Sequence, residues 1–355
     1  MFKVVKNWGQ KYLSDPQAIL LLFVIGALVA LVLWMGKILA PVIASIVIAY
    51  ILQWFANILI SWRVPRLAAV LIVYSGFMGL FLCAIFILWP VIWQQLLKLY
   101  EEIPSMMTSA QHFLYLLPDK FPEFLTKETV DGWVASFLMQ LKQSGKMLFT
   151  VSVATLPSLI AMVIYIVLVP IMAFFFLKDN QLIRNWLVSF LPTHRPLLTK
   201  VVVEMNQQIG NYIRGKVAEV FIVGIAMYIA FYAFGMHYAM LVSVLVGLSV
   251  LIPYVGAAIV TIPVIFVAFF QWGFGPEFGY LLLTYGIVQT IDGTVIVPLL
   301  FSGIVKLHPL AIIVAVLVFG GWWGFWGVFF AIPLASLVKA VIEAWPRAEV
   351  IANEQ

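Results

Sequence analysis

One carboxyl group stands inside a long apolar stretch of this chain. Asp292 lies in the run 280–301, which is long enough to cross a lipid bilayer. On a helix, Tyr285, Gln289 and Asp292 fall at i, i+4 and i+7 and share one face. An ionisable side chain at mid-span costs about 2.5–3.5 kcal/mol on insertion and normally faces protein or water. The stripe therefore predicts a substrate or ion pathway.

The sequence leaves two roles open for Asp292. Its carboxyl group can bind a coupling ion, alternating between a charged form and a neutral or occupied form, with Gln289 and Tyr285 as neutral ligands and Lys306 as a distant counter-charge. Alternatively, Gly293 follows it, so Asp292 can cap a second half-helix that begins there. The first role concerns transport and the second concerns architecture.

A second segment with polar and charged residues lies directly before a later apolar run. The segment "GNYIRGKV", which ends at Val217, matches G-x-x-x-x-G-K, but Val217 stands where a P-loop needs Ser or Thr, and an amphipathic helix precedes it. We therefore exclude nucleotide binding there and predict a cytoplasmic elbow at Arg214, Gly215 and Lys216, with the two cations at the inner headgroups. In the simpler interpretation, Glu219 pairs with Lys216 and the Lys216 side chain extends toward the headgroups. Alternatively, Glu219 belongs to the pathway.

Two segments in the second half of the chain resemble each other. "GAAIVTIP" and "GVFFAIP" each follow a short apolar arm and a helix break, which predicts two helical hairpins that enter the membrane and return. The simpler alternative is that Gly and Pro are common in membrane helices. With the polar stripe, the predicted pathway comprises Asp292, Gln289, Tyr285, Glu219, Pro253 and Gly256. The predicted packing or hinge positions are Gly320, Gly321, Gly324, Gly327 and Pro333.

The motifs of common hydrolases and metal sites are absent from the sequence. It has no H-E-x-x-H, no G-x-S-x-G and no second intramembrane Asp beside Asp292, and its four histidines lack ligand spacing. Its single cysteine, Cys83, cannot form an intrachain disulfide. We therefore expect no enzyme activity, no cofactor and no metal.

The composition places these residues in a membrane. The 355 residues are 64% hydrophobic and 10% charged, with a mean hydropathy of +1.09, and a soluble protein cannot cover so much apolar surface. The formal charge of +5 does not indicate a nucleic-acid partner, because Lys and Arg are scattered between apolar runs. The predicted fold class is an all-α, polytopic membrane helix bundle.

The apolar runs and the basic connections predict an organisation. Clear spans lie near 17–36, 38–60, 67–97, 151–177 and 217–234, with a kink expected at Pro90, and shorter ones near 239–252, 257–272, 279–300, 309–319 and 325–345. The predicted parts are 1–97, the first three membrane helices; 98–150, two or three extracytoplasmic amphipathic helices; 151–177, the fourth membrane helix; 178–216, a cytoplasmic amphipathic segment; 217–345, helices with two hairpins; and 346–355, a tail.

The positions of Lys and Arg predict an orientation. The basic N-terminal segment, the connection between the second and third spans, and 178–216 fall on one side if the first five spans alternate. The positive-inside rule makes that side cytoplasmic. Lys37 and 98–150 then lie outside, and the C-terminus lies inside if 325–345 returns from a hairpin.

Several segments together resemble a known family. "NYIRGKV", "LIPYVGA", "DGTVIVPLLF", "LHPLAIIVAVLVFGG" and "GFWGVFFAIPLA" are similar to the autoinducer-2 exporter family of membrane proteins, most closely to its permease branch. The resemblance covers essentially the whole chain and is strongest over 204–346. It implies an inner-membrane protein of about eight membrane helices, often a homo-oligomer, with pentamers known, that exports a quorum-sensing signal or exchanges sodium for protons.

Two functions from different classes follow. The first is a secondary transporter, a permease that exports a small solute or exchanges a monovalent cation for protons. The second is a non-transporting membrane scaffold or assembly protein that docks partners through 98–150. The expected partners are the lipid bilayer, a small molecule or ion, and further copies of the chain.

Overall fold

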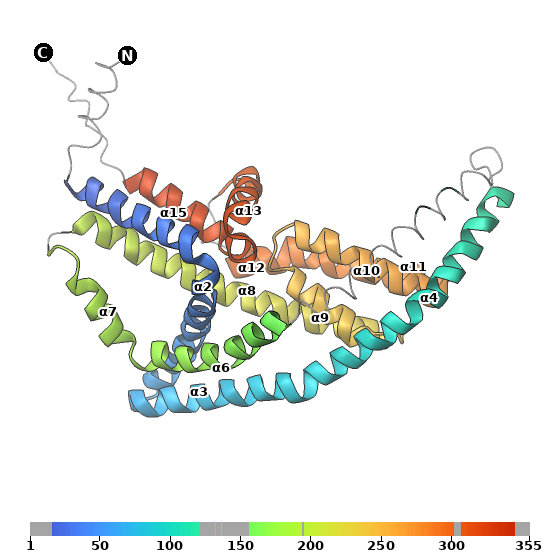
Figure 1. Ribbon diagram of the computed structural model, residues 1–355, viewed down its shortest axis with the longest axis horizontal. Coiled ribbons are helices and arrows are strands. Elements are labelled where there is room, and N and C mark those ends of the chain that lie inside the picture. The colour runs from blue at the N-terminus through green and yellow to red at the C-terminus, as the bar shows by residue number, and fades with distance from the viewer. Residues whose placement is uncertain are drawn as a thin grey trace, which may run out of the picture.

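Helices form every regular element that the structure, a computed structural model, describes (Figure 1). It describes residues 16–120, 132, 136, 156–193, 195–301 and 307–344. The all-α prediction is therefore confirmed. The helices are α2 (Pro16–Ser61), α3 (Arg66–Cys83), α4 (Trp89–Lys120), α6 (Leu156–Lys178), α7 (Asn180–Ser189), α8 (Pro196–Ala233), α9 (Ala239–Ser249), α10 (Val255–Trp272), α11 (Pro276–Ile291), α12 (Val297–Phe301), α13 (Pro309–Trp323), α14 (Phe325–Phe329) and α15 (Ala331–Ala344).

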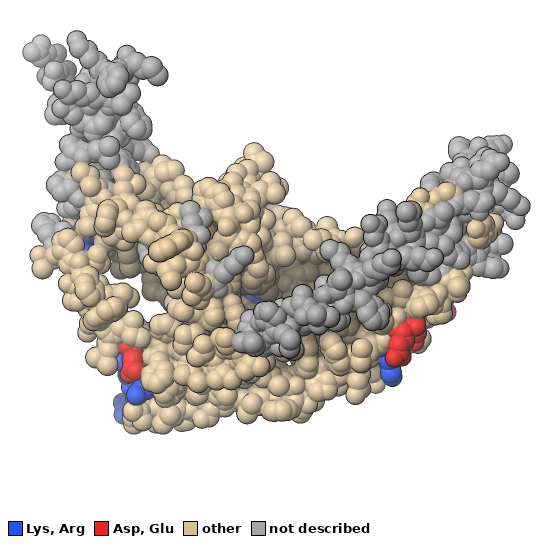
Figure 2. Space-filling view, in the orientation of Figure 1, with Lys and Arg blue, Asp and Glu red and all other residues tan. Residues whose placement is uncertain are grey.

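The apolar helices make this a polytopic membrane bundle. Within the described residues, five helical stretches are long and apolar enough to cross a membrane, or six if the bent pair α6 and α7 forms one span. Helices α9 and α13 are apolar but shorter, as expected for hairpin arms. In Figure 2, charged side chains gather at the lower left and lower right, with uncharged surface between them.

The first two predicted spans belong to one helix. α2 continues for 46 residues, about 69 Å if it were straight. Lys37 therefore lies within a helix, and the prediction of a separate outer connection there is wrong. Figure 1 shows α2 changing direction along its length, and Pro41 inside it removes a backbone donor at which a helix can bend.

The third span is also longer than expected. α3 passes through a π-helical turn, η1 (Ala84–Leu88), directly into α4. Pro90 follows this π-helical turn inside the continuous helix and removes one backbone donor there. Pro104 and Pro118 lie inside α4 and do not end it, so the helix breaks expected at these two prolines are absent. Most of 121–155 lies outside the described residues, as do the N-terminal segment 1–15 and the tail.

Three helix ends lie together at one end of the molecule. Leu21 of α2, Leu198, Val201 and Met205 of α8, and Ala340 of α15 form one buried apolar cluster. The larger core lies between α8, α9, α10, α11 and α4. There α8 crosses α9 closely, because a Cβ on Gly247 would lie 3.0 Å from the Cα of Gly224.

The two sequence echoes occupy equivalent places in two hairpins. Gly256 begins the return arm after α9, and a Cβ there would lie 1.8 Å from the carbonyl oxygen of Ser249. In the hairpin formed by α13, α14 and α15, a Cβ on Gly327 would lie 1.8 Å from the carbonyl oxygen of Phe319. Each glycine therefore allows the backbone to fold back onto the end of the preceding arm.

The other predicted packing positions of the second hairpin divide by role. Gly320 contacts Val328, whose Cγ2 would lie 2.7 Å from an added Cβ, and Gly324 has a φ of +61° in the turn between α13 and α14. Pro333 is buried in α15. By contrast, an added Cβ on Gly321 would have nothing within 4 Å, so this glycine is not a packing position among the described residues.

We expect Gly327→Ala to destabilise the protein and Gly321→Ala to leave it unchanged or slightly more stable. The new methyl group at position 327 must displace backbone, which costs about 1–3 kcal/mol. At position 321 Ala only gains helix propensity, up to about 1 kcal/mol. Thermal unfolding of both variants in detergent checks this; equal melting temperatures would contradict the packing role of Gly327.

Candidate functional site

An ion pair is buried on α8. Lys216 and Glu219 are only 4% and 2% exposed, and the Lys216 Nζ lies 2.8 Å from the Glu219 Oε2. The same ammonium group donates a hydrogen bond of 2.7 Å to the carbonyl oxygen of Val250, at the C-terminal end of α9. A cation is favourable at that end because the last carbonyls of a helix have no partner within it.

The pairing of Lys216 with Glu219 is thus present, but the predicted elbow is wrong. α8 runs without interruption through Arg214, Gly215 and Lys216. Lys216 faces the protein interior rather than the headgroups. Arg214 is only partly buried, donates to the Gly210 carbonyl and the Asn211 side chain, and lies over the Trp54 ring.

Aromatic side chains close the space around Lys216. A Cβ on Gly215 would lie 2.7 Å from the Phe301 ring, so the absence of a side chain lets α12 approach α8. The Lys216 Nζ lies 5.3 Å from the centre of the same ring, within range of a cation–π interaction. The buried Tyr212, one turn earlier, donates a 2.8 Å hydrogen bond to the Phe329 carbonyl at the end of α14.

Both hairpins therefore dock on one face of α8. Tyr212 and Lys216 stand at i and i+4, and each donates to a backbone carbonyl at the turn of a different hairpin. Pro253 and Gly256 shape the first of these turns, in which the backbone N–H of Gly256 bonds to the Ile252 carbonyl at 3.0 Å. Pro253 and Gly256, which the sequence predicted on the pathway, instead support the turn beside Val250.

Asp292, the residue that follows α11, lies near the Lys216–Glu219 ion pair. It is 8% exposed, and it interacts electrostatically with both Lys216 and Glu219. Its Oδ1 is buried and has no hydrogen-bond partner among the described residues. Unpaired buried carboxylate oxygens are costly and uncommon, so this oxygen is a candidate position for a proton or a bound cation.

The capping interpretation of Asp292 is wrong. Its backbone is helical, with φ −56° and ψ −56°, and the chain continues through the π-helical turn η2 (Asp292–Ile296) into α12. Its Oδ1 accepts no capping hydrogen bond from the described residues. A π turn leaves the helical ladder locally widened and often marks a functional position.

The predicted polar stripe lies on the inner face of α11. Tyr285 is buried, and its hydroxyl accepts a 2.9 Å hydrogen bond from the Gln289 side chain. It also lies 2.7 Å from the hydroxyl of Thr261 on α10. Sequence reasoning missed Thr261, because a single hydroxyl in an apolar run gives no signal. Lys306, the proposed counter-charge, lies outside the described residues.

An all-helical bundle with several apolar spans and a charged cluster buried between them defines a multi-pass membrane protein with an internal polar site. The chain matches the family described as AI-2E family transporter over residues 18–347. It therefore belongs to this family of transporters, as the sequence motifs predicted.

Individual relatives agree with this family. The chain is 44% identical over 350 residues to "Putative permease PerM" of Escherichia coli (strain K12), covering 99% of each chain. It is 24% identical over 294 residues to "Putative transport protein YueF" of Bacillus subtilis (strain 168), covering 79% of this chain and 77% of that one.

Proposed function

We propose that this protein is a secondary transporter that exchanges a monovalent cation for protons, or exports a small solute coupled to such an ion. Lys216, Glu219 and Asp292 form its ion-responsive site. The observation that supports this most is the buried Asp292 oxygen, which has no hydrogen-bond partner among the described residues and lies near the Lys216–Glu219 ion pair.

The net charge of the cluster is the reason for proposing a proton or a monovalent cation as its ligand. With all three groups ionised, one ammonium and two carboxylates carry a net charge of −1. A net charge is costly to bury in a region of low dielectric constant. One proton or one monovalent cation at Asp292 neutralises the cluster, whereas a divalent cation would leave it positive.

Exchange follows if the two ions compete. A proton on Asp292 removes the negative charge that attracts a metal cation, so the site holds one or the other. The hairpins and the π turn are elements whose movement can open the site to one side of the membrane and then to the other, as in transporters built from broken helices. The Thr261, Tyr285 and Gln289 side chains give polar contacts along α10 and α11 toward the same carboxylate.

Reconstituted protein distinguishes transport from scaffolding. Proteoliposomes with an internal pH dye are given an outward sodium, potassium or lithium gradient. We expect proton movement that depends on one of these gradients and is absent from protein-free liposomes. A pure scaffold would give dye signals equal to the protein-free control with every ion.

We further propose that the protein lies in the inner membrane with both termini in the cytoplasm. The start of α2, the start of α8 and the end of α15 pack together, which supports placing all three helix ends on the same side of the membrane. We propose that α2, which bends along its length, begins and ends on the cytoplasmic side. The stretch from Arg66 to Lys98 in α3, η1 and α4 carries no charged residue over a rise of about 48 Å, which supports a crossing from there to the outside.

Cysteine labelling tests this orientation. In a Cys83→Ala background, an impermeant maleimide added to intact cells should label Lys120→Cys and leave Lys200→Cys unlabelled. Both sites should react after the cells are opened, which controls for accessibility. Labelling of Lys200→Cys from outside would overturn the orientation.

A further inference from the structure

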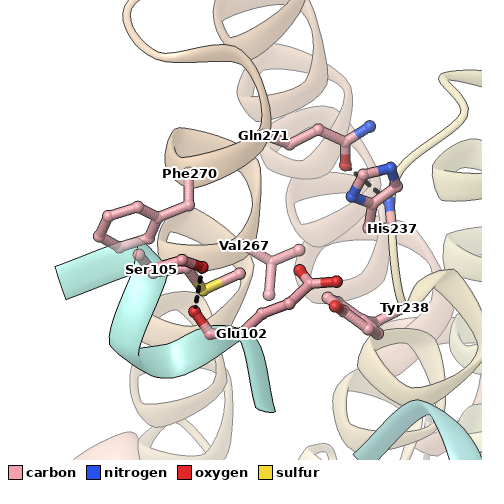
Figure 3. Close-up of a pocket in the computed structure, with 8 residues that line it drawn as sticks. Glu102, Ser105, His237, Tyr238, Val267, Phe270 and Gln271 are labelled. Carbon is pink, nitrogen blue, oxygen red and sulfur yellow. Dashed lines mark hydrogen bonds between the residues drawn. The ribbon is translucent and has the colours of Figure 1, made fainter. Parts of the chain in front are cut away.

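A cavity with mixed polar and apolar walls lies away from the charged cluster. It has a volume of about 200 Å³ and is formed where α4 meets the loop before α9 and the end of α10 (Figure 3). Its lining residues are Glu102, Ser105, Met106, His237, Tyr238, Val267, Phe270 and Gln271. The Glu102 side chain extends from α4 toward Tyr238 in Figure 3.

The walls of this cavity are fixed by specific hydrogen bonds. The Gln271 side chain accepts from the backbone N–H of His237 at 2.6 Å and donates to the Gly235 carbonyl at 2.7 Å. The Gln95 side chain accepts from the backbone N–H of Leu241 at 2.8 Å and ties α4 to the first turn of α9. Tyr238 is held at a φ of +58°, which is uncommon for a residue with a side chain.

The chemistry of the lining favours a positive ligand. Glu102 supplies a carboxylate, and none of the lining residues is Lys or Arg. Burial and the Glu102 carboxylate raise the pKa of the Tyr238 phenol well above its usual range, so the phenol stays neutral and adds no negative charge. No permanently charged cation in the lining therefore balances the negative charge of Glu102.

The remaining groups favour an organic cation over a metal ion. Phe270 and Tyr238 present aromatic rings, and Met106 presents a polarisable thioether. Among the described residues, no three His, Cys, Asp or Glu side chains gather in a way that could hold a metal ion. We propose that this cavity binds a small organic cation, with its ammonium group at Glu102 and its apolar part against Phe270.

This site is separate from the Asp292 cluster. Thr261, the last polar group of the inner stripe, lies about 15 Å along α10 from Gln271. The buried Val264, Val267 and Ala268 fill the helix face between them. Binding in this cavity therefore does not depend on the proposed ion exchange.

Calorimetric titration of the purified full-length protein tests the proposal with choline as the probe. Its neutral isostere dimethylbutanol, in which carbon replaces the quaternary nitrogen, is the matched ligand. We expect choline to bind at least about tenfold more tightly than the isostere, because a charged group gains more from the Glu102 carboxylate than a neutral one. Equal affinities, no choline binding at millimolar concentration, or displacement of choline by equimolar sodium would overturn the proposal.

Two variants locate the binding. Glu102→Gln keeps the shape of the side chain and should weaken choline binding about tenfold or more. Glu101→Gln removes the neighbouring acid of α4, which is exposed like Glu102 but does not line the cavity, and should leave affinity unchanged. Asp292→Asn should also bind choline normally, so failure of the ion-exchange proposal and failure of this one are distinguishable. An equal loss in both Glu variants would show only a general surface charge effect and would overturn the site.

Discussion

Asp292→Asn should abolish ion-coupled flux in proteoliposomes while the protein still folds. Asn keeps the size of the side chain but cannot gain or lose a proton or bind a cation by charge. Losing one charged interaction at a buried site costs about 1.5–3 kcal/mol, which corresponds to about a ten- to hundredfold loss of flux or affinity. Fluorescence from an internal pH dye after an imposed cation gradient measures it.

Two controls separate transport from folding at Asp292. Thr290→Val changes an exposed residue of the same helix, whose hydroxyl only bonds to the Gly286 carbonyl, and should keep full flux. Asp292→Ala should lose flux but retain its melting temperature in detergent, because the Asp292 backbone is helical and its Oδ1 accepts no hydrogen bond from the described residues. Gradient-driven flux at the native rate in a folded Asp292→Asn protein would leave this carboxylate without a transport role.

Lys216→Met should be strongly destabilising. Met fills a similar volume, but the change leaves the Glu219 carboxylate buried without its cation and the Val250 carbonyl without its donor. The formal charge of the cluster changes from −1 to −2. Breaking a buried pair by removing one partner typically costs about 3–5 kcal/mol. Thermal and denaturant unfolding in detergent measure the loss.

A second substitution tests whether unbalanced charge is the cause. Lys216→Met with Glu219→Gln returns the formal charge to −1 and should recover a large part of the stability. Lys339→Met breaks an exposed pair with Glu343, which lies 3.8 Å away, and should cost no more than about 1 kcal/mol. A double variant as unstable as Lys216→Met alone would point to lost packing instead.

Local patterns in the sequence predicted the contacts that occur within one helix. Tyr285, Gln289 and Asp292 share a buried face because helical spacing alone brings them together. Lys216 and Glu219 pair for the same reason. The equivalent roles of Gly256 and Gly327 also follow from local spacing, since each lets a chain fold back on its own preceding arm.

Contacts between distant helices and the ends of long helices were not predictable in this way. Nothing in the sequence brings Asp292 of α11 to Lys216 of α8, because that meeting depends on how the hairpins pack. The sequence did not predict that helices continue across positions 98 and 217, because an amphipathic segment and an apolar span have the same helical period. One helix can therefore pass from one environment to the other without a break.

The docking of both hairpins on one face of α8 has a mechanical consequence. Tyr212 and Lys216 hold the two turns from the same helix, four residues apart. A rotation of α8 about its axis moves both side chains in the same direction and strains both hydrogen bonds together. The two hairpins are thus mechanically coupled through α8, and a rotation of this helix would release both turns at the same time.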